Sequence, residues 1–272
     1  MKVLYDNNHN VSYNLEGDEC SLRRITDYWT PEKKKRAIPD LCQDDDESYD
    51  AEQFCETAVT EPCVADIGRM PFSAAGKLFF TRDGNDYVAS AEVFQKNNIV
   101  LTAAHCIQDK NTGNLCENFL FERCYNEGVA AENLTFKTVA LKEFWKSKKE
   151  WKWDYGLAIL NSNSNAKSVL TYSTENAMGK ETTAFGYPVN YYGGKKMVYV
   201  DGSISAGNYS GTMLLNGDKM RGGCSGGAWV LKGSSTVIGL NSYGPVSEKV
   251  DYMGSPVLDE YFDSLYQYVL SL

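Results

Sequence analysis

Three short stretches lying far apart in the chain constrain its fold most, because a fold has to bring their polar residues together. Residues 101–106 form a short apolar run that contains His105, one of only two histidines in the sequence. Residues 153–160 place Asp154 at the start of an apolar strand, and residues 222–227 set Ser225 among glycines. Histidine, aspartate and serine in this chain order match one of the orders in which an activated serine recurs.

These residue types suit nucleophilic catalysis. A serine hydroxyl is a weak nucleophile until a neighbouring base accepts its proton, and imidazole titrates near neutral pH. His105 is the predicted base, Asp154 would fix its tautomer, and Ser225 is the predicted nucleophile. The glycines allow a tight turn that aims the backbone N–H groups of Gly223 and Ser225 at an oxyanion. Losing one such donor typically raises a reaction barrier by about 2.7–4 kcal/mol.

Together the three stretches resemble the chymotrypsin-like superfamily of serine peptidases. Residues 102–106 match its histidine motif without substitution, residues 154–160 are similar to its aspartate strand, and residues 223–227 to its serine motif. Shorter matches resemble the glutamyl-endopeptidase-like (V8-like) branch and, upstream, a propeptide segment of its secreted, mostly microbial, members. The matches to the V8-like branch lie at residues 71–72, 76–78 and 186–188, and the match to the propeptide segment lies at residues 28–32.

The resemblance implies an all-β fold: two six-stranded antiparallel β-barrels with a C-terminal helix and an N-terminal extension. We expect residues 1–66 to be the extension, a pro-segment, and residues 67–272 to be the peptidase domain. The first barrel would span about 67–165 and the second about 166–272. Short apolar runs divided by turn signals agree with this division. They lie at residues 77–80, 98–101, 182–185, 197–200, 227–230 and 236–240, with a turn at 83–85.

Local patterns predict two helices. Thr30 can cap a helix and Pro31 fits its first position, so a helix is expected to begin there. The basic run at residues 33–36 is interpreted as a solvated helix face, with a processing site as the alternative. Residues 259–272 are apolar at helical spacing, which predicts a C-terminal helix docked on the second barrel.

Substrate selection is predicted by resemblance alone. Asn241, Ser242, Tyr243 and Gly244 would form the strand that pairs with the substrate backbone and lines one pocket wall, and Ser242 would also bond the triad aspartate. Lys219 and Met220 would lie near the pocket base. Without an aspartate there, a trypsin-like preference for arginine or lysine is not expected. Lys219 could favour an acidic residue by charge pairing, and small or apolar residues are the alternative.

Cys224 raises the alternative of a cysteine protease, because virus-type relatives on the same fold use a cysteine in a Gly-x-Cys-Gly-Gly frame. Here the two glycines follow Ser225, so Ser225 lies in the nucleophile register and Cys224 is interpreted as a small buried residue. In the trypsin branch this position is an aspartate that pairs with a newly freed N-terminus. A cysteine cannot form that ion pair, so we hypothesise that the N-terminal segment acts as an inhibitory or folding pro-segment.

Composition narrows the class of protein. The net charge of −9 argues against nucleic-acid binding, and no apolar run approaches the ~20 residues of a membrane span. No signal peptide is visible after Met1. Neither a metal nor a cofactor is expected, because the eight cysteines form no Cys-x-x-Cys pair and histidine is almost absent.

The cysteines nevertheless favour secretion. Seven of the eight precede residue 125, which suggests disulfides between the extension and the first barrel. Three sequons, at Asn10, Asn133 and Asn208, fit a secretory route and glycosylation. Residues 88–91 hold no cysteine where relatives usually carry the partner of Cys106. Cys106 is therefore free or paired elsewhere, with Cys63, Cys116 and Cys124 as candidates.

We therefore predict a secreted serine endopeptidase that hydrolyses protein or peptide substrates through an acyl-enzyme. Neither nucleic acid nor membrane is an expected partner, and the N-terminal segment is an expected intramolecular inhibitor. The alternative is a catalytically silent chymotrypsin-like module that binds a protein partner through its cleft or acidic surface. Because all three triad positions are present, the sequence favours the enzyme.

Overall fold

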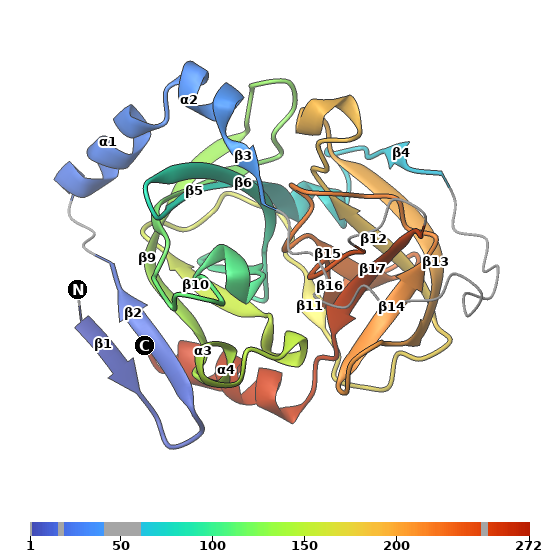
Figure 1. Ribbon diagram of the computed structural model, residues 1–272. Coiled ribbons are helices and arrows are strands. Elements are labelled where there is room, and N and C mark those ends of the chain that lie inside the picture. The colour runs from blue at the N-terminus through green and yellow to red at the C-terminus, as the bar shows by residue number, and fades with distance from the viewer. Residues whose placement is uncertain (1, 16–18, 41–60, 246–249) are drawn as a thin grey trace.

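The first half of the molecule is a closed antiparallel barrel (Figure 1). The structure is a computed structural model, and it describes residues 2–15, 19–40, 61–245 and 250–272. Six strands follow one another in the order β9-β10-β7-β6-β5-β8, and pairing of β8 with β9 closes the barrel. They are β5 (Ala75–Arg82), β6 (Asn85–Val93), β7 (Ile99–Thr102), β8 (Glu117–Arg123), β9 (Glu132–Lys142) and β10 (Gly156–Leu160).

A second, largely antiparallel sheet forms the other half. In the described part of the chain its strands follow the order β11-β16-β15-β12-β13-β14-β17, with only β11 and β16 parallel. They are β11 (Thr171–Tyr172), β12 (Glu181–Gly186), β13 (Val198–Ala206), β14 (Thr212–Asn216), β15 (Ala228–Leu231), β16 (Thr236–Leu240) and β17 (Tyr252–Pro256). The predicted all-β fold class is confirmed. The apolar runs predicted from the sequence overlap strands β5 and β7 of the first half and β12, β13, β15 and β16 of the second.

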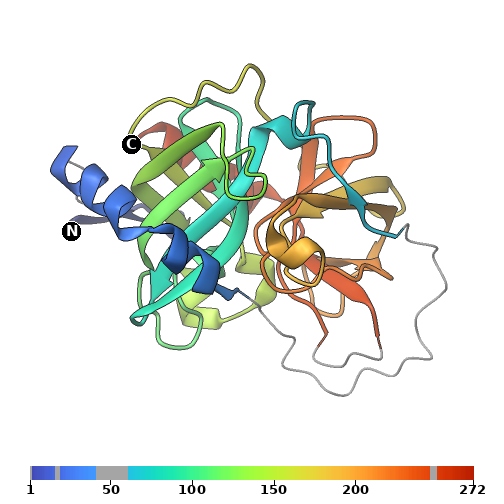
Figure 2. The ribbon, with the colours of Figure 1, turned by 90° about the horizontal axis from the view of Figure 1, so that it is seen from above.

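The N-terminal residues contribute strands to both halves. The strands β1 (Lys2–Tyr5) and β2 (Asn10–Asn14) extend the first sheet, because β2 pairs with β9. Helices α1 (Glu19–Tyr28) and α2 (Pro31–Arg36) then lie along the outside of the first barrel (Figure 2). Next, β3 (Ile38–Pro39) pairs with β6 in parallel, and β4 (Cys63–Val64) pairs with β13. The predicted extension therefore borders both halves of the predicted peptidase domain.

Both predicted helices are confirmed at their N-terminal ends. The Thr30 hydroxyl accepts a hydrogen bond from the backbone N–H of Lys33, and Pro31 begins α2. Asp259 caps α4 (Glu260–Leu270), whose apolar face is buried. The predicted docking on the second barrel is wrong: this face packs mainly on the first sheet, beside β2, β9 and β10, because its aromatic rings pack against residues such as Phe94 and Tyr155. The other helices are α3 (Phe144–Lys148) and short 3-10 turns at Phe72–Ala74, Ala104–Cys106, Trp151–Trp153 and Tyr192–Gly194.

The cysteines that the structure describes carry no disulfide. Cys63, Cys106, Cys116, Cys124 and Cys224 are all free thiols. Of the alternatives for Cys106, the free thiol is therefore the one observed, and its pairing with the three candidate cysteines is not. Side chains of the remaining cysteines, at positions 20, 42 and 55, lie outside the described residues.

The three sequons lie in different environments. The side chain of Asn10 is buried and donates to Asp6 and to the carbonyl of Ser264, so it is unavailable to a glycosyl group in the folded chain. Asn133 is exposed and Asn208 is half-buried. In the described ranges, no helix is both long and apolar enough to cross a membrane.

Candidate active site

The register of two neighbouring strands brings His105 and Asp154 together. Strand β7 pairs with β10 so that Thr102 lies opposite Gly156, and each polar residue lies just beyond its strand. His105 Nδ1 is 2.7 Å from Asp154 Oδ2, and the backbone N–H of His105 donates to Asp154 Oδ1 at 2.8 Å. Because a carboxylate only accepts hydrogen bonds, Nδ1 carries the proton, and Nε2 is the basic nitrogen of the neutral ring.

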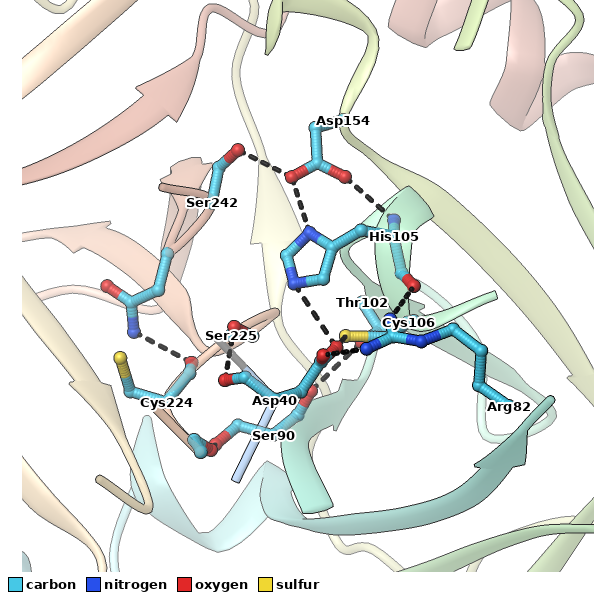
Figure 3. Close-up of polar contacts among 12 residues, drawn as sticks. Asp40, Arg82, Ser90, Thr102, His105, Cys106, Asp154, Cys224, Ser225 and Ser242 are labelled. Carbon is cyan, nitrogen blue, oxygen red and sulfur yellow. Dashed lines mark hydrogen bonds and ion pairs between the residues drawn. The ribbon is translucent and has the colours of Figure 1, made fainter. Parts of the chain in front are cut away.

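A serine from the second half of the molecule also forms a hydrogen bond with Asp154. Ser242 Oγ donates to Asp154 Oδ2 at 2.5 Å (Figure 3). All three side chains are buried, so solvent does not compete for these hydrogen bonds. The two oxygens of Asp154 accept three hydrogen bonds, which fix the orientation of the carboxylate. The carboxylate in turn fixes the plane of the His105 imidazole. This bond also fits the contact expected for Ser242 from the sequence.

The glycine loop presents Ser225 at the boundary between the two halves. Gly223 has a φ of +97°, and a Cβ there would lie 2.6 Å from the Tyr187 carbonyl oxygen, so only glycine fits. The N–H of Gly223 and the hydroxyl of Ser225 donate to the same atom, the carbonyl oxygen of Asp40, at 2.9 and 3.2 Å. A carbonyl oxygen thus lies where the predicted oxyanion donor and the predicted nucleophile converge.

Ser90 supports this loop, a role that the sequence did not predict. The sequence showed only that residues 88–91 hold no cysteine. Its hydroxyl donates to the carbonyl oxygen of Gly223 and accepts from the N–H of Tyr187, both at 3.0 Å. Its own N–H donates to the carbonyl of Ser225 at 2.8 Å. This hydroxyl therefore fixes the peptide group between Gly223 and Cys224. The N–H of Val189 donates to the Gly222 carbonyl at 2.9 Å and fixes the peptide group that carries the N–H of Gly223.

Asp40 fills the space beside His105, which the sequence did not predict. Its backbone N–H donates to the Val88 carbonyl at 2.8 Å, so it continues the pairing of β3 with β6. Its carboxylate lies 2.8 Å from Arg82 Nη2 and 3.5 Å from His105 Nε2, and it accepts from the Cys106 thiol at 3.6 Å. Asp40 is 0% exposed, and it is 185 residues from Ser225 in the chain. Figure 3 shows it between Ser225 and Arg82.

Asp40, His105 and Cys106 also form the one group in the described ranges whose donor atoms are close enough to hold a metal ion. Two properties make it a poor cation site. The Arg82 guanidinium already neutralises the Asp40 carboxylate, and burial raises the pKa of the Cys106 thiol to about 12. A thiol binds metals as the thiolate, so this donor set is better suited to the ion pair it already makes.

The residues predicted to select substrate lie in different environments. Asn241 is buried, and its hydrogen-bond partners lie inside the protein. Its amide donates hydrogen bonds to the carbonyls of Phe185 and Cys224 and accepts one from Trp229 Nε1. Tyr243 is buried and donates to Thr212, and Gly244 follows it. The ammonium of Lys219 lies at the surface on the carboxylate of Glu61, while Met220 is buried. A direct role of Lys219 toward substrate stays a prediction.

Cys224 lies in the core of the second half, among Met220, Trp229 and Ile238. Burial raises the pKa of its thiol well above the usual range. A protonated, enclosed thiol is a poor nucleophile, which agrees with the interpretation of Cys224 as a buried packing residue.

Known proteins resemble both the sequence and the fold. The family described as "Trypsin-like peptidase domain" matches residues 89–240, a range that holds His105, Asp154 and Ser225. No curated protein shows significant similarity to the chain. Among solved structures, the protease Anisep from Arthrobacter nicotinovorans is 26% identical, with a TM-score of 0.67 over 73% of this chain and 96% of that one.

Two further structures share the architecture. The thermostable serine protease AL20 from an extremophilic microorganism is 24% identical, with a TM-score of 0.67 over 72% of this chain and 96% of that one. A Glu endopeptidase is 16% identical, with a TM-score of 0.63 over 80% of this chain and 98% of that one. These likenesses confirm the chymotrypsin-like fold that the sequence predicted.

Proposed function

The chain belongs to the trypsin-like peptidase family, and from this premise we propose that it is a serine endopeptidase using His105, Asp154 and Ser225. One observation carries the proposal. The carbonyl oxygen of Asp40 is held by Gly223 N–H and Ser225 Oγ, beside an imidazole that Asp154 orients. A scissile carbonyl placed there would have the nucleophile, the base and an oxyanion donor around it.

The proposed reaction uses these atoms in two stages. Ser225 Oγ attacks the scissile carbonyl carbon while His105 Nε2 accepts the hydroxyl proton, and the oxyanion is stabilised by the N–H groups of Gly223 and Ser225. Collapse of the tetrahedral intermediate breaks the C–N bond, and the imidazolium gives its proton to the leaving amine. Water then repeats the sequence on the acyl-enzyme, which releases the acid and restores Ser225.

We further propose that the described structure is a latent form, inhibited by residues 19–40. Asp40 occupies the position of the scissile carbonyl, and its carboxylate faces the basic nitrogen of His105. Helices α1 and α2 anchor this segment, with Trp29 buried against Phe79 and Lys34 paired with Glu122. Lys35 and Arg36 are exposed at the end of α2, so cleavage after Arg36 would separate Asp40 from its anchors. This is the proposed activation step.

Cleavage preference and export are also proposals. An acidic residue before the scissile bond, or alternatively a small or an apolar one, remains the expected preference, since Lys219 and Met220 stand at the predicted pocket base. Export is supported by the exposed sequon at Asn133, and recovery of the glycosylated chain from culture medium would test it.

The catalytically silent module is the second candidate, and one experiment separates the two. A sequence-specific protease site is inserted between Arg36 and Ala37, and the chain is treated with a fluorophosphonate probe before and after cutting. We expect strong labelling of the cut chain, weaker labelling of the uncut chain, and none in Ser225→Ala. Ser162→Ala, which changes an exposed serine outside the sequons, serves as the control and should label like the wild type.

Absence of labelling from folded chain in both states would favour the silent module. Labelling that persists in Ser225→Ala would assign the activated nucleophile to another residue. Equal labelling before and after cutting would leave the enzyme proposal standing and overturn the proposed latency.

A further inference from the structure

The site that holds the Asp40 side chain is built by the predicted peptidase domain itself. Arg82 Nη2 contacts the carboxylate at 2.8 Å, and the Cys106 thiol and the His105 ring form the rest of the contacts. With Asp40 in place, only 15% of the Arg82 side chain is exposed. A buried guanidinium paired with a buried carboxylate is a specific recognition contact, because leaving either charge unpaired inside the protein is costly.

Contacts other than Asp40 hold Arg82 in its orientation. Its Nη1 donates to the His105 carbonyl at 3.3 Å, its Nε is 3.8 Å from Asp109 Oδ2, and its guanidinium stacks on Tyr87 at 4.2 Å. All of these partners lie on the barrel and not on the N-terminal segment. We expect the guanidinium to keep its position when Asp40 leaves, with Nη2 directed into the vacated space.

The position of the Arg82 guanidinium relative to Ser225 indicates which part of a bound substrate it would contact. Ser242, which belongs to the predicted acyl-side strand, lies on one side of His105, whereas Asp40 and Arg82 lie on the other (Figure 3). On that other side β3 occupies part of β6, pairing at Tyr87 and Val88. A substrate that displaces β3 would therefore run past Arg82 with the residues that follow its scissile bond.

We propose that Arg82 forms an acidic-side-chain subsite on the leaving-group side of the cleft, and that Asp40 occupies this subsite in the latent form. The peptidase would then prefer substrates with aspartate or glutamate at the first or second residue after the scissile bond. This inference rests on the proposed endopeptidase function and adds to it a substrate class.

The test uses the full chain cut between Arg36 and Ala37, and internally quenched peptides randomised before the scissile bond. Paired pools carry Asp or Asn at the first or second position after it. We expect kcat/KM to be about tenfold or more higher for the Asp pool at one of these positions, as for a hydrogen bond to a charged group. Arg82→Gln should bring the ratio near one, and Arg82→Glu should make a Lys pool the best substrate.

The ratio is measured within one enzyme preparation, so it does not depend on how much of a variant is folded or released from latency. Arg69→Gln is the matched control, because Arg69 is exposed and pairs with Asp66 away from the site, and its ratio should equal that of the wild type. Cleavage of all pools at equal rates, or a preference that survives Arg82→Gln, would overturn the subsite while leaving the endopeptidase intact. Absence of both cleavage and fluorophosphonate labelling would overturn both.

Discussion

Asp218, close to the serine loop, makes the stability of the molecule depend on pH. Its side chain is buried and accepts a hydrogen bond from Met220 N–H at 2.8 Å, and burial raises the pKa of its carboxyl to about 7 from 3.8. Between pH 4 and 7 the folded chain keeps a proton that the unfolded chain has lost. The contribution of Asp218 to stability therefore falls as pH rises through this window.

Replacing Asp218 with asparagine removes this titration and keeps an acceptor for Met220 N–H. We expect Asp218→Asn to leave the free energy of unfolding nearly unchanged at pH 4 and to raise it by ~2–4 kcal/mol at pH 8, since one pKa unit corresponds to about 1.36 kcal/mol. Urea unfolding at the two pH values measures this difference. Asp66→Asn, at an exposed aspartate, should show no such change, and an equal gain at both pH values would contradict the titration argument.

Sequence motifs predicted the residues of the proposed reaction but not those that occupy or support the site. His105, Asp154 and Ser225 stand in local patterns that the chemistry requires, so they were predicted. In the structure His105 contacts Asp154, and both His105 and Ser225 contact Asp40. Asp40 and Arg82 follow no local pattern. Their pairing depends on where β3 meets β6, a contact between segments 42 residues apart that no short motif encodes.

At the level of elements, α1 and α2 pack on the outside of the first barrel just before β3 and Asp40, and the buried Trp29 lies between the two helices in the chain. Its ring is buried against Phe79 at 5.4 Å between centroids, and its Nε1 donates to the Asn118 carbonyl at 2.6 Å. Thr30 then begins α2 immediately after it. The propeptide-like stretch at residues 28–32 therefore combines an aromatic anchor with a helix start.

Trp29→Ala should weaken this docking, because truncating a buried tryptophan typically costs about 3–5 kcal/mol. We expect fluorophosphonate labelling of the uncut chain to be at least about tenfold faster, a change that needs only about 1.4 kcal/mol, with little effect on the cut chain. Tyr5→Ala, at an exposed aromatic of β1, is the control. An unchanged labelling rate in a folded, uncut variant would show that α1 and α2 do not anchor the inhibitory segment.

Elements with strong local signals were predicted, and those that depend on partners were not. The cap at Thr30 and the apolar spacing after Asp259 were sufficient to predict where α2 and α4 begin. The strands β1 and β2 were not predicted, because residues 1–14 are mostly polar. Pairing of β2 with β9 and contacts with α4 bury Asn10, Val11 and Ser12. The register with a distant strand, and not local composition, makes this segment part of the first sheet.

For the molecule as a whole, the N-terminal 40 residues divide into two parts with different physical roles. Residues 19–40 run along the outside of the barrel and end at Asp40, which contacts His105 and Ser225. Residues 2–14 instead join the barrel to the C-terminal helix: Asn10 donates to the Ser264 carbonyl, and Ser12 shares a hydrogen bond of 2.8 Å with Tyr268. Cleavage after Arg36, the proposed activation step, would separate α1 and α2 from Asp40 within the first part, whereas the second part stabilises the folded protein.

Because β2 is mostly buried and β1 is exposed, two truncations of the N-terminus should differ in their effect on stability. Deleting residues 1–14 removes buried Val11 and uncovers β9 and α4, so we expect a loss of about 3 kcal/mol or more and a melting temperature roughly 10 °C lower. Deleting only residues 1–5 removes β1, whose residues are all exposed, and should change the melting temperature little. Thermal unfolding followed by circular dichroism compares the two. If both truncations melt like the full chain, the β1–β2 hairpin does not stabilise the folded protein, and it would be free to leave with α1 and α2 after cleavage at Arg36.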